Sequence, residues 1–509
     1  MIRYHEATKH TVASVMYSSH YLDWSNEPSP FRAYPGAPRV ALSRRPEPLP
    51  GKALATIARL GSSRAGGIEG LCAETLSRLL FHSVAISAWK EVKGTGFRYS
   101  LRVNPSSGNL HPNETWLALR GVSGIEDGLW HYDARSHALE RRRDGGAVAA
   151  VAAAAGDPAI GGCRAVVVLS SIFWREAWKY RDRAFRYCLH DAGHAAASIL
   201  VAARALGFRG EVRGAFDDAR LTEILAIAAD DGERPLLVLP LFESDSGPAV
   251  PTGAPLGPAL GAPEPARYEW DHPVIAASAA TKVPVTTVSD TVVTRVTTVS
   301  DTVVTGRDDG LAAVVRRRRS ALDFDPAATM AAADLDALLR HATRPFPSDF
   351  GGGLVTLYPF VHAVDGVAPG AYRFDAASGR LDLVVAGDQR RTAAGLSLGQ
   401  DIAANAVVAF TMAADLARAE RLFGPRGYRY ALVEAGFIGQ LLYVGAEALG
   451  FNATGIGAFY DDDVNRFLAL DAPATQAVYH FSVGRAVPDP RLVEVADEDD
   501  QSSSPESRK

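Results

Sequence analysis

Two histidines stand four residues apart in the stretch His190-Asp191-Ala192-Gly193-His194. The spacing matches H-E-x-x-H, the helical signature of zinc proteases, except that Asp191 is one methylene shorter than Glu. A third metal ligand is not evident nearby, and a glycine in the middle of a long apolar helix is typical of close packing against a neighbour. We therefore expect a packing helix here and no metal site, with His194 in the core or at an interface.

A second candidate for ligand binding is the loop NPSSGN, which contains Pro105, Ser106, Ser107 and Asn109. Hydroxyls, a carboxamide and exposed backbone amides could clamp an anion or the polar edge of a flat heteroaromatic ring. We expect a helix to begin near residues 114–116, so a plain helix-entry turn is the alternative interpretation.

A third candidate is a run of four arginines, Arg316–Arg319, that leads into Ser320. The fork of a guanidinium group matches the oxygens of a phosphate, so Arg318 and Arg319 are candidates for a phosphate grip. The alternative is a solvated charged face.

The elements that must position these residues occur twice. Residues 185–208 and 428–451 align at a constant offset of 243, and eleven of the 24 positions are identical. The same offset relates RGAFDDARLTEIL (213–225) to IGAFYDDDVNRFL (456–468). Internal repetition of this kind indicates that the two halves share one fold.

Composition marks the boundaries between these halves. Residues 246–309 are rich in Pro and Gly and contain VTTVSDTVVT twice, which predicts a linker. The end of the chain, 489–509, becomes acidic and then Ser-rich, which predicts disorder. We therefore divide the rest into an extension (1–50), a first domain (51–245) and a second domain (310–488).

Bulk properties exclude several classes of protein. The net charge of −5 gives no basic field for nucleic acid. No run of about 18 apolar residues predicts a membrane span, and the N-terminus lacks the apolar core of a signal peptide. The three cysteines lie far apart and match neither a metal site nor a disulfide framework, so we expect a cytoplasmic protein.

Together, NPSSGNLHP, WKY..R..RY....GH and IGAF.DD..NRFL.LD resemble the nitroreductase-like flavoproteins, and most closely the SagB/ThcOx-type dehydrogenases. The resemblance covers most of 1–245 and 310–487. It implies an α+β fold, FMN bound at a dimer interface and two-electron redox chemistry. In azole-forming members, the flavin dehydrogenates thiazolines or oxazolines of a peptide.

The resemblance also implies how the two halves share one site. In such dimers one subunit supplies the P-S-S-x-N loop, and the other supplies the R-R-S segment, the I-G-A-F backbone and a C-terminal basic residue. The first half keeps the loop but has no arginine at the end of its last strand, whereas the second half has Gly351-Gly352-Gly353 in place of the loop. We therefore expect an intramolecular pseudo-dimer with one composite FMN site and an empty second site. The expected FMN-binding residues are Pro105, Ser106, Ser107, Asn109, Arg318, Arg319, Ser320, Ile456, Gly457, Ala458 and Arg485.

The resemblance assigns catalysis to Lys179 and Tyr180, a pair thought to handle the proton that leaves as hydride passes to the flavin. The second half has Leu422 and Phe423 at these positions. A lysine at the surface of a helix start is the alternative.

Three functions remain open at this level. The first is an FMN-dependent dehydrogenase acting on an azoline-like or other peptide-derived substrate. The second is a nitroreductase or quinone reductase that uses NAD(P)H as reductant and a small-molecule acceptor. The third is a flavin-fold scaffold without activity.

Overall fold

The computed structural model describes residues 1–18, 20–62, 70–228, 232–243, 255–263, 277–278 and 309–495. Most of the predicted linker, including its ten-residue repeat, lies outside the described residues. The described piece 255–263 runs along the first half, where the Gly257 and Leu260 amides donate to the carbonyls of Asp144 and Arg142.

The first half is built on a seven-stranded sheet. Its order is β1-β6-β5-β4-β7-β9-β8, and the interior strand β7 (Ala165–Ile172) is buried along its whole length. Alternate residues of β7 face α7 (Ala184–Ala205) on one side and α5 (Ala147–Ala155) with α8 (Asp218–Ile224) on the other. The other strands are β1 (Arg39–Ala41), β4 (Asn113–Leu119), β5 (Gly128–Asp133), β6 (Ala138–Asp144), β8 (Arg209–Gly210) and β9 (Glu233–Phe242).

The prediction of a helix that begins near residues 114–116 is wrong. These residues belong to β4, which pairs antiparallel with β5 on one side and β7 on the other. Pairing on both edges gives the backbone amides and carbonyls of β4 their hydrogen-bond partners. The strand is fully buried, and Thr115 and Trp116 are of residue types that favour such strands.

The second half repeats this sheet in the order β14-β13-β11-β15-β17-β16. Each strand corresponds to the strand at the same place in the first sheet, apart from the added edge strand β1. The fold is therefore α+β and duplicated, as the repeat predicts. The strands are β11 (Val355–Val361), β13 (Gly370–Asp375), β14 (Arg380–Ala386), β15 (Val408–Asp415), β16 (Asn452–Ile456) and β17 (Thr475–Gly484).

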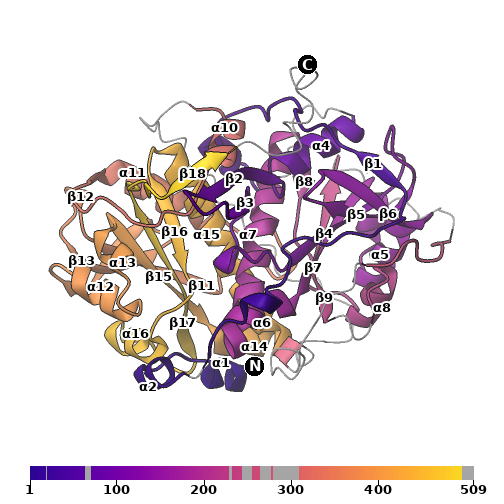
Figure 1. Cartoon of the computed structure of the whole chain (residues 1–509). Helices are drawn as coiled ribbons and strands as arrows, with labels where there is room; N and C mark the ends of the chain where they lie inside the picture. The colour runs from indigo at the N-terminus through magenta and orange to yellow at the C-terminus, as the bar shows by residue number, and fades with distance from the viewer. Residues whose placement is uncertain are drawn as a thin grey trace, which may run out of the picture.

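Two 22-residue helices, α7 and α15 (Gly427–Ala448), lie between the sheets at the centre of the molecule (Figure 1). They approach most closely at Gly193 and Gly436, where a Cβ on Gly193 would lie 2.9 Å from Gly436 Cα. Residues of both halves join one hydrophobic core. The chain is thus an intramolecular pseudo-dimer.

Two segments, one near the N-terminus and one at the end of the described second half, make contacts that join the two halves. Near the N-terminus, Tyr4 packs edge-on against Phe185 of the first half and Tyr428 of the second, each at 5.9 Å between ring centroids. At the other end, β18 (Leu492–Val495) pairs antiparallel with β2 (Ile86–Val92) of the first half, beside β3 (Arg98–Arg102). Figure 1 shows the yellow β18 beside the purple β2.

We predicted disorder from residue 489 onwards, but Leu492–Val495 form a strand that pairs with the edge of β2. The tail beyond Val495 lies outside the described residues. No helix in the described part of the chain has both the length and the apolar character needed to cross a membrane.

Candidate active site

A cavity of about 610 Å³ lies between the halves and is lined by both. Its volume falls within the range of roughly 300–1,000 Å³ typical of small-molecule and cofactor pockets. The predicted site residues that line it are Pro105, Ser106, Ser107, Asn109 and Tyr180 of the first half, with Arg318, Arg319, Ser320, Ile456, Gly457 and Ala458 of the second.

The loop of the first half is held by a carboxylate on α7. Asp191 accepts hydrogen bonds from Ser106 Oγ at 2.5 Å, Ser107 N at 3.0 Å and Ser107 Oγ at 2.9 Å. The side chain of Asn109 is also engaged, since its Nδ2 donates to Ser100 O at 2.9 Å. The polar side chains expected to clamp a ligand thus fix the shape of the loop.

The turn itself needs glycine. Gly108 has φ +59°, and a Cβ there would lie 2.7 Å from Tyr180 Oη and 3.2 Å from Lys179 Nζ. The Lys179–Tyr180 pair at the end of α6 (Phe173–Tyr180) therefore packs directly on the loop. Burial raises the pKa of Tyr180 well above its ordinary value, so its hydroxyl keeps its proton at neutral pH.

The arginines of the second half enter the cavity from the opposite side. Arg318 donates to Val103 O at 2.9 Å and Arg102 O at 3.1 Å, while its Nη1 is buried without a partner in the described residues. Burial lowers the pKa of Arg318 to about 10, so it remains charged at neutral pH. Arg319 pairs with Glu494 of β18 at 3.0 Å.

Arg485 does not belong to this group. It lies outside the cavity lining, with its guanidinium carbon 4.9 Å from the centre of the Phe451 ring and Nη1 3.3 Å from Gly450 O. The residues that follow it, Ala486 to Asp489, line the cavity instead. Arg485 is therefore not among the residues that line the cavity, and its role in holding FMN stays a prediction.

The nitroreductase family model, described as "Nitroreductase family", matches residues 46–241 and 315–485. The chain belongs to the nitroreductase family. The two matched segments are the two halves of the pseudo-dimer, so each half is a nitroreductase domain.

Individual proteins and solved structures are similar to this chain. A putative nitroreductase of Methanocaldococcus jannaschii is 29% identical over 175 residues, which cover 34% of this chain and 84% of that protein. The crystal structure of a putative nitroreductase from Anabaena variabilis superposes with a TM-score of 0.76 at 24% identity, covering 95% of this chain and 99% of that one. The Escherichia coli microcin synthetase complex with truncated pro-MccB17 gives a TM-score of 0.30 at 18% identity, over 48% and 88% of the two chains.

The second nitroreductase domain closes the symmetry-related position with its own residues. The Asp349 carboxylate accepts from the amides of Gly214 and Ala215 at 2.8 and 3.0 Å. Phe350 stacks on Tyr430 at 4.2 Å between ring centroids and an interplanar angle of 5°. We expected this position to hold no FMN, which stays a prediction; Asp349 and Phe350, at the positions of Ser106 and Ser107, lie against the groups that would face a cofactor there.

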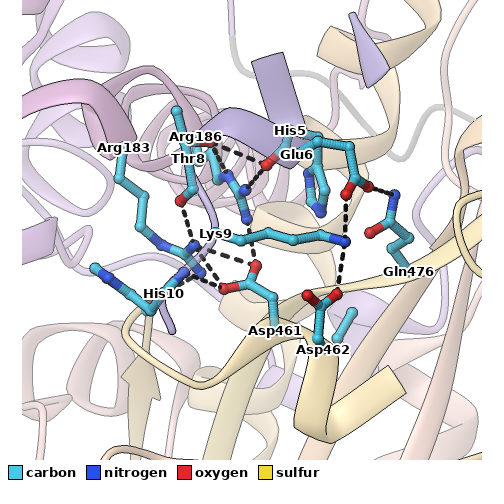
Figure 2. Close-up of polar contacts among 12 residues, drawn as sticks. His5, Glu6, Thr8, Lys9, His10, Arg183, Arg186, Asp461, Asp462 and Gln476 are labelled. Carbon is cyan, nitrogen blue, oxygen red and sulfur yellow. Dashed lines mark hydrogen bonds and ion pairs between the residues drawn. The ribbon is translucent and has the colours of Figure 1, made fainter. Parts of the chain in front are cut away.

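A buried ion network joins the two nitroreductase domains beside the cavity (Figure 2). Asp461 of the second domain pairs with Arg183, which directly precedes α7 of the first domain, at 2.9 Å and with Arg186 of α7 at 2.7 Å. The N-terminal segment joins in, since the His10 amide donates to Asp461 at 2.9 Å. The mirror network pairs Arg426 and Arg429 with Asp218, again at the offset of 243.

The pentapeptide with two histidines serves packing and loop anchoring. His190 stacks on Tyr479 at 4.3 Å, and His194 Nε2 lies 3.1 Å from Tyr479 Oη. Within the described residues, no three histidine, cysteine or acidic side chains are grouped to hold a metal ion.

Sequence reasoning missed Asp191 as an anchor for the loop. The signal was present, because the equivalent residue Glu434 is also acidic and accepts from the amides of Gly353 and Leu354 at 2.7 and 3.0 Å. An acidic residue occurs at this position in both domains, whereas the two histidines beside it occur only in the first. This pattern points to an acid that anchors the backbone of the loop.

Proposed function

We propose that the open cavity binds FMN and that the protein is an FMN-dependent oxidoreductase which dehydrogenates an azoline-like or other peptide-derived substrate. The observation that carries this proposal is the difference between the two symmetry-related positions. One is a cavity lined by Tyr180, Arg318 and Arg319, with Lys179 packed on the Gly108 turn behind the lining, and the other is filled by Asp349 and Phe350.

The filled position indicates what the open one would accept. On the filled side, a carboxylate meets two loop amides and a flat ring stacks on Tyr430. The equivalent groups on the open side, Gly457, Ala458 and Tyr187, line the cavity. A ligand with a flat ring system and acceptor atoms at its edge would make the corresponding contacts, and the isoalloxazine ring of FMN has both.

The arginines fit the other end of FMN. Arg318 keeps one buried guanidinium nitrogen without a partner in the described residues, and Arg319 lies beside it on the cavity wall. A buried unpaired donor is costly, so an anionic group of a ligand is its natural partner. A phosphate in this place would complete the lining.

The cofactor would supply the acceptor for two electrons as a hydride. The chain supplies proton management and position. Lys179 Nζ packs on the Gly108 turn, and Lys179 would act as the general base that takes the proton the substrate loses. Tyr180, kept neutral by burial, can donate a hydrogen bond to the same substrate atom or to Lys179.

Titration of the purified protein with FMN, followed by the flavin absorption band, tests the cofactor. Turnover of a thiazoline or oxazoline peptide, followed by mass spectrometry as a loss of two hydrogens, tests the reaction. Rapid oxidation of NADH with a nitroaromatic acceptor, without turnover of the azoline peptide, would favour the nitroreductase or quinone-reductase alternative. A protein that binds no flavin would be a scaffold.

A further inference from the structure

Glu176 is a fully buried acid that the proposed reaction does not use. It lies on α6 one turn before Tyr180, and neither carboxyl oxygen accepts a hydrogen bond from an N–H or O–H donor among the other described residues. The titratable groups around it are Asp191, Lys179, Tyr180 and Cys188. The second domain has Ala419 at the equivalent position, so this acid occurs only beside the open cavity.

A buried carboxylate without a donor is too costly to remain ionised, so Glu176 is held as the neutral acid. Burial raises the pKa of Glu176 well above its ordinary value, and the charge of Asp191 raises it further against the opposite effect of Lys179. The neutral acid carries an O–H donor, and the Asp191 carboxyl lies within its hydrogen-bonding reach.

Asp191 connects this proton to the cavity. It accepts from Ser106 and Ser107, and the next residue of that loop, Gly108, packs on Lys179 and Tyr180. Glu176 and Tyr180 both lie on α6. Glu176 therefore contacts Asp191, Asp191 holds the loop, and the loop packs back on Tyr180 of the same helix.

We propose that Glu176 is a positioning residue that donates its proton to Asp191, and that the shared proton holds the Ser106–Asn109 loop against Lys179 and Tyr180. The pair of carboxyl groups then carries one negative charge. Two charges would be unfavourable, because two buried carboxyls in contact cannot both ionise. The consequence for FMN binding rests on the proposed function, whereas the shared proton does not.

The first test uses the ligand-free full chain and compares the wild type with Glu176→Gln. The folded wild type keeps a proton that the unfolded chain releases above about pH 4.3, so stability falls as the pH rises from there towards the raised pKa. Gln has no such proton and still offers an N–H donor to Asp191. We expect the unfolding midpoint of the wild type to fall at least about 3 °C more than that of E176Q between pH 5.5 and 8.5. Parallel pH profiles would overturn the shared proton.

The second test measures the affinity for FMN at pH 7. We expect Glu176→Gln to bind FMN within about threefold of the wild type, and Glu176→Ala, which removes the donor, to bind at least about fivefold more weakly. Should E176A fail to fold, Glu176→Leu removes the donor while filling the space. Wild-type affinity in the variant without a donor would overturn the positioning role.

Glu434→Gln is the matched control, because it alters a buried acid at the Asp191 position of the filled side. We expect it to leave FMN affinity unchanged. If the wild type itself does not bind FMN, the proposed function and the positioning role are both wrong, and the pH comparison alone decides whether the proton is shared.

Discussion

Gly193 of α7 and Gly436 of α15 lie directly against each other where the two central helices cross. A Cβ on Gly436 would lie 2.8 Å from His190 Cα and closer still to the His190 carbonyl oxygen, and backbone cannot move aside as a side chain can. This contact lets the two central helices of the pseudo-dimer pack closely against each other.

We expect Gly436→Ala to destabilise the protein by about 3 kcal/mol or more, since it forces apart two packed helices. Urea unfolding at pH 7 measures the change. Gly395→Ala is the matched control, because this glycine is exposed on α12 (Arg390–Leu396) with no neighbouring atom within 4 Å of an added Cβ. There, alanine should stabilise by up to about 1 kcal/mol. Similar losses in both variants would contradict the close contact.

We expect close to one FMN per chain, because Asp349 and Phe350 fill the second position. The ratio of flavin absorbance to protein concentration after removal of free FMN measures it. A ratio near two would show that both positions accept the cofactor and would contradict the composite site.

Replacing Arg319 should weaken FMN binding by about 1.5–3 kcal/mol, the usual worth of a charge-assisted hydrogen bond to a phosphate. Arg485→Ala should leave the affinity unchanged, since its guanidinium lies over Phe451 outside the cavity. Isothermal titration of both variants with FMN compares them. Loss of binding in R485A alone would place the phosphate end elsewhere.

Lys179→Ala should leave FMN bound with an unchanged spectrum and lower the turnover of a dehydrogenation substrate at least about tenfold, because it removes the base. Reduction of the bound flavin by dithionite needs no base and serves as the control reaction. Turnover at the wild-type rate would make Lys179 a structural residue and favour the nitroreductase alternative.

Asp461→Asn should cost about 3–5 kcal/mol at pH 7, because it leaves Arg183 and Arg186 buried without their carboxylate. Asp462→Asn, at an exposed carboxylate that shares Lys9 with Glu6, should cost less than about 1 kcal/mol. Chemical unfolding of both variants gives the comparison.

The same carboxylate predicts a pH dependence. Burial alone would raise the pKa of Asp461, but the charges of Arg186 and Arg183 outweigh it and hold the pKa well below the usual range. Its contribution to stability is therefore complete above about pH 4 and is lost as the pH falls towards the folded pKa. The unfolding midpoint of the wild type should drop more steeply below pH 4 than that of D461N, and equal slopes would argue against the ion network.

The amino-acid sequence by itself determined the duplicated fold, since identical residues such as Tyr187 and Tyr430 recur at a constant offset of 243 in several segments. It also determined which half could keep the P-S-S-x-N loop and Lys179. These are local matters of residue type and spacing, and they do not depend on where distant segments meet.

Only the tertiary structure decided the rest. It showed that Asp349 and Phe350 fill the second position, that Arg485 lies outside the cavity and that Asp191 holds the loop. Each of these depends on which residues far apart in the chain come within a few ångströms of each other, and spacing along the chain carries no such distance. Residues 113–119 were decided in the same way, because pairing with strands on both sides outweighs the local preference of the segment.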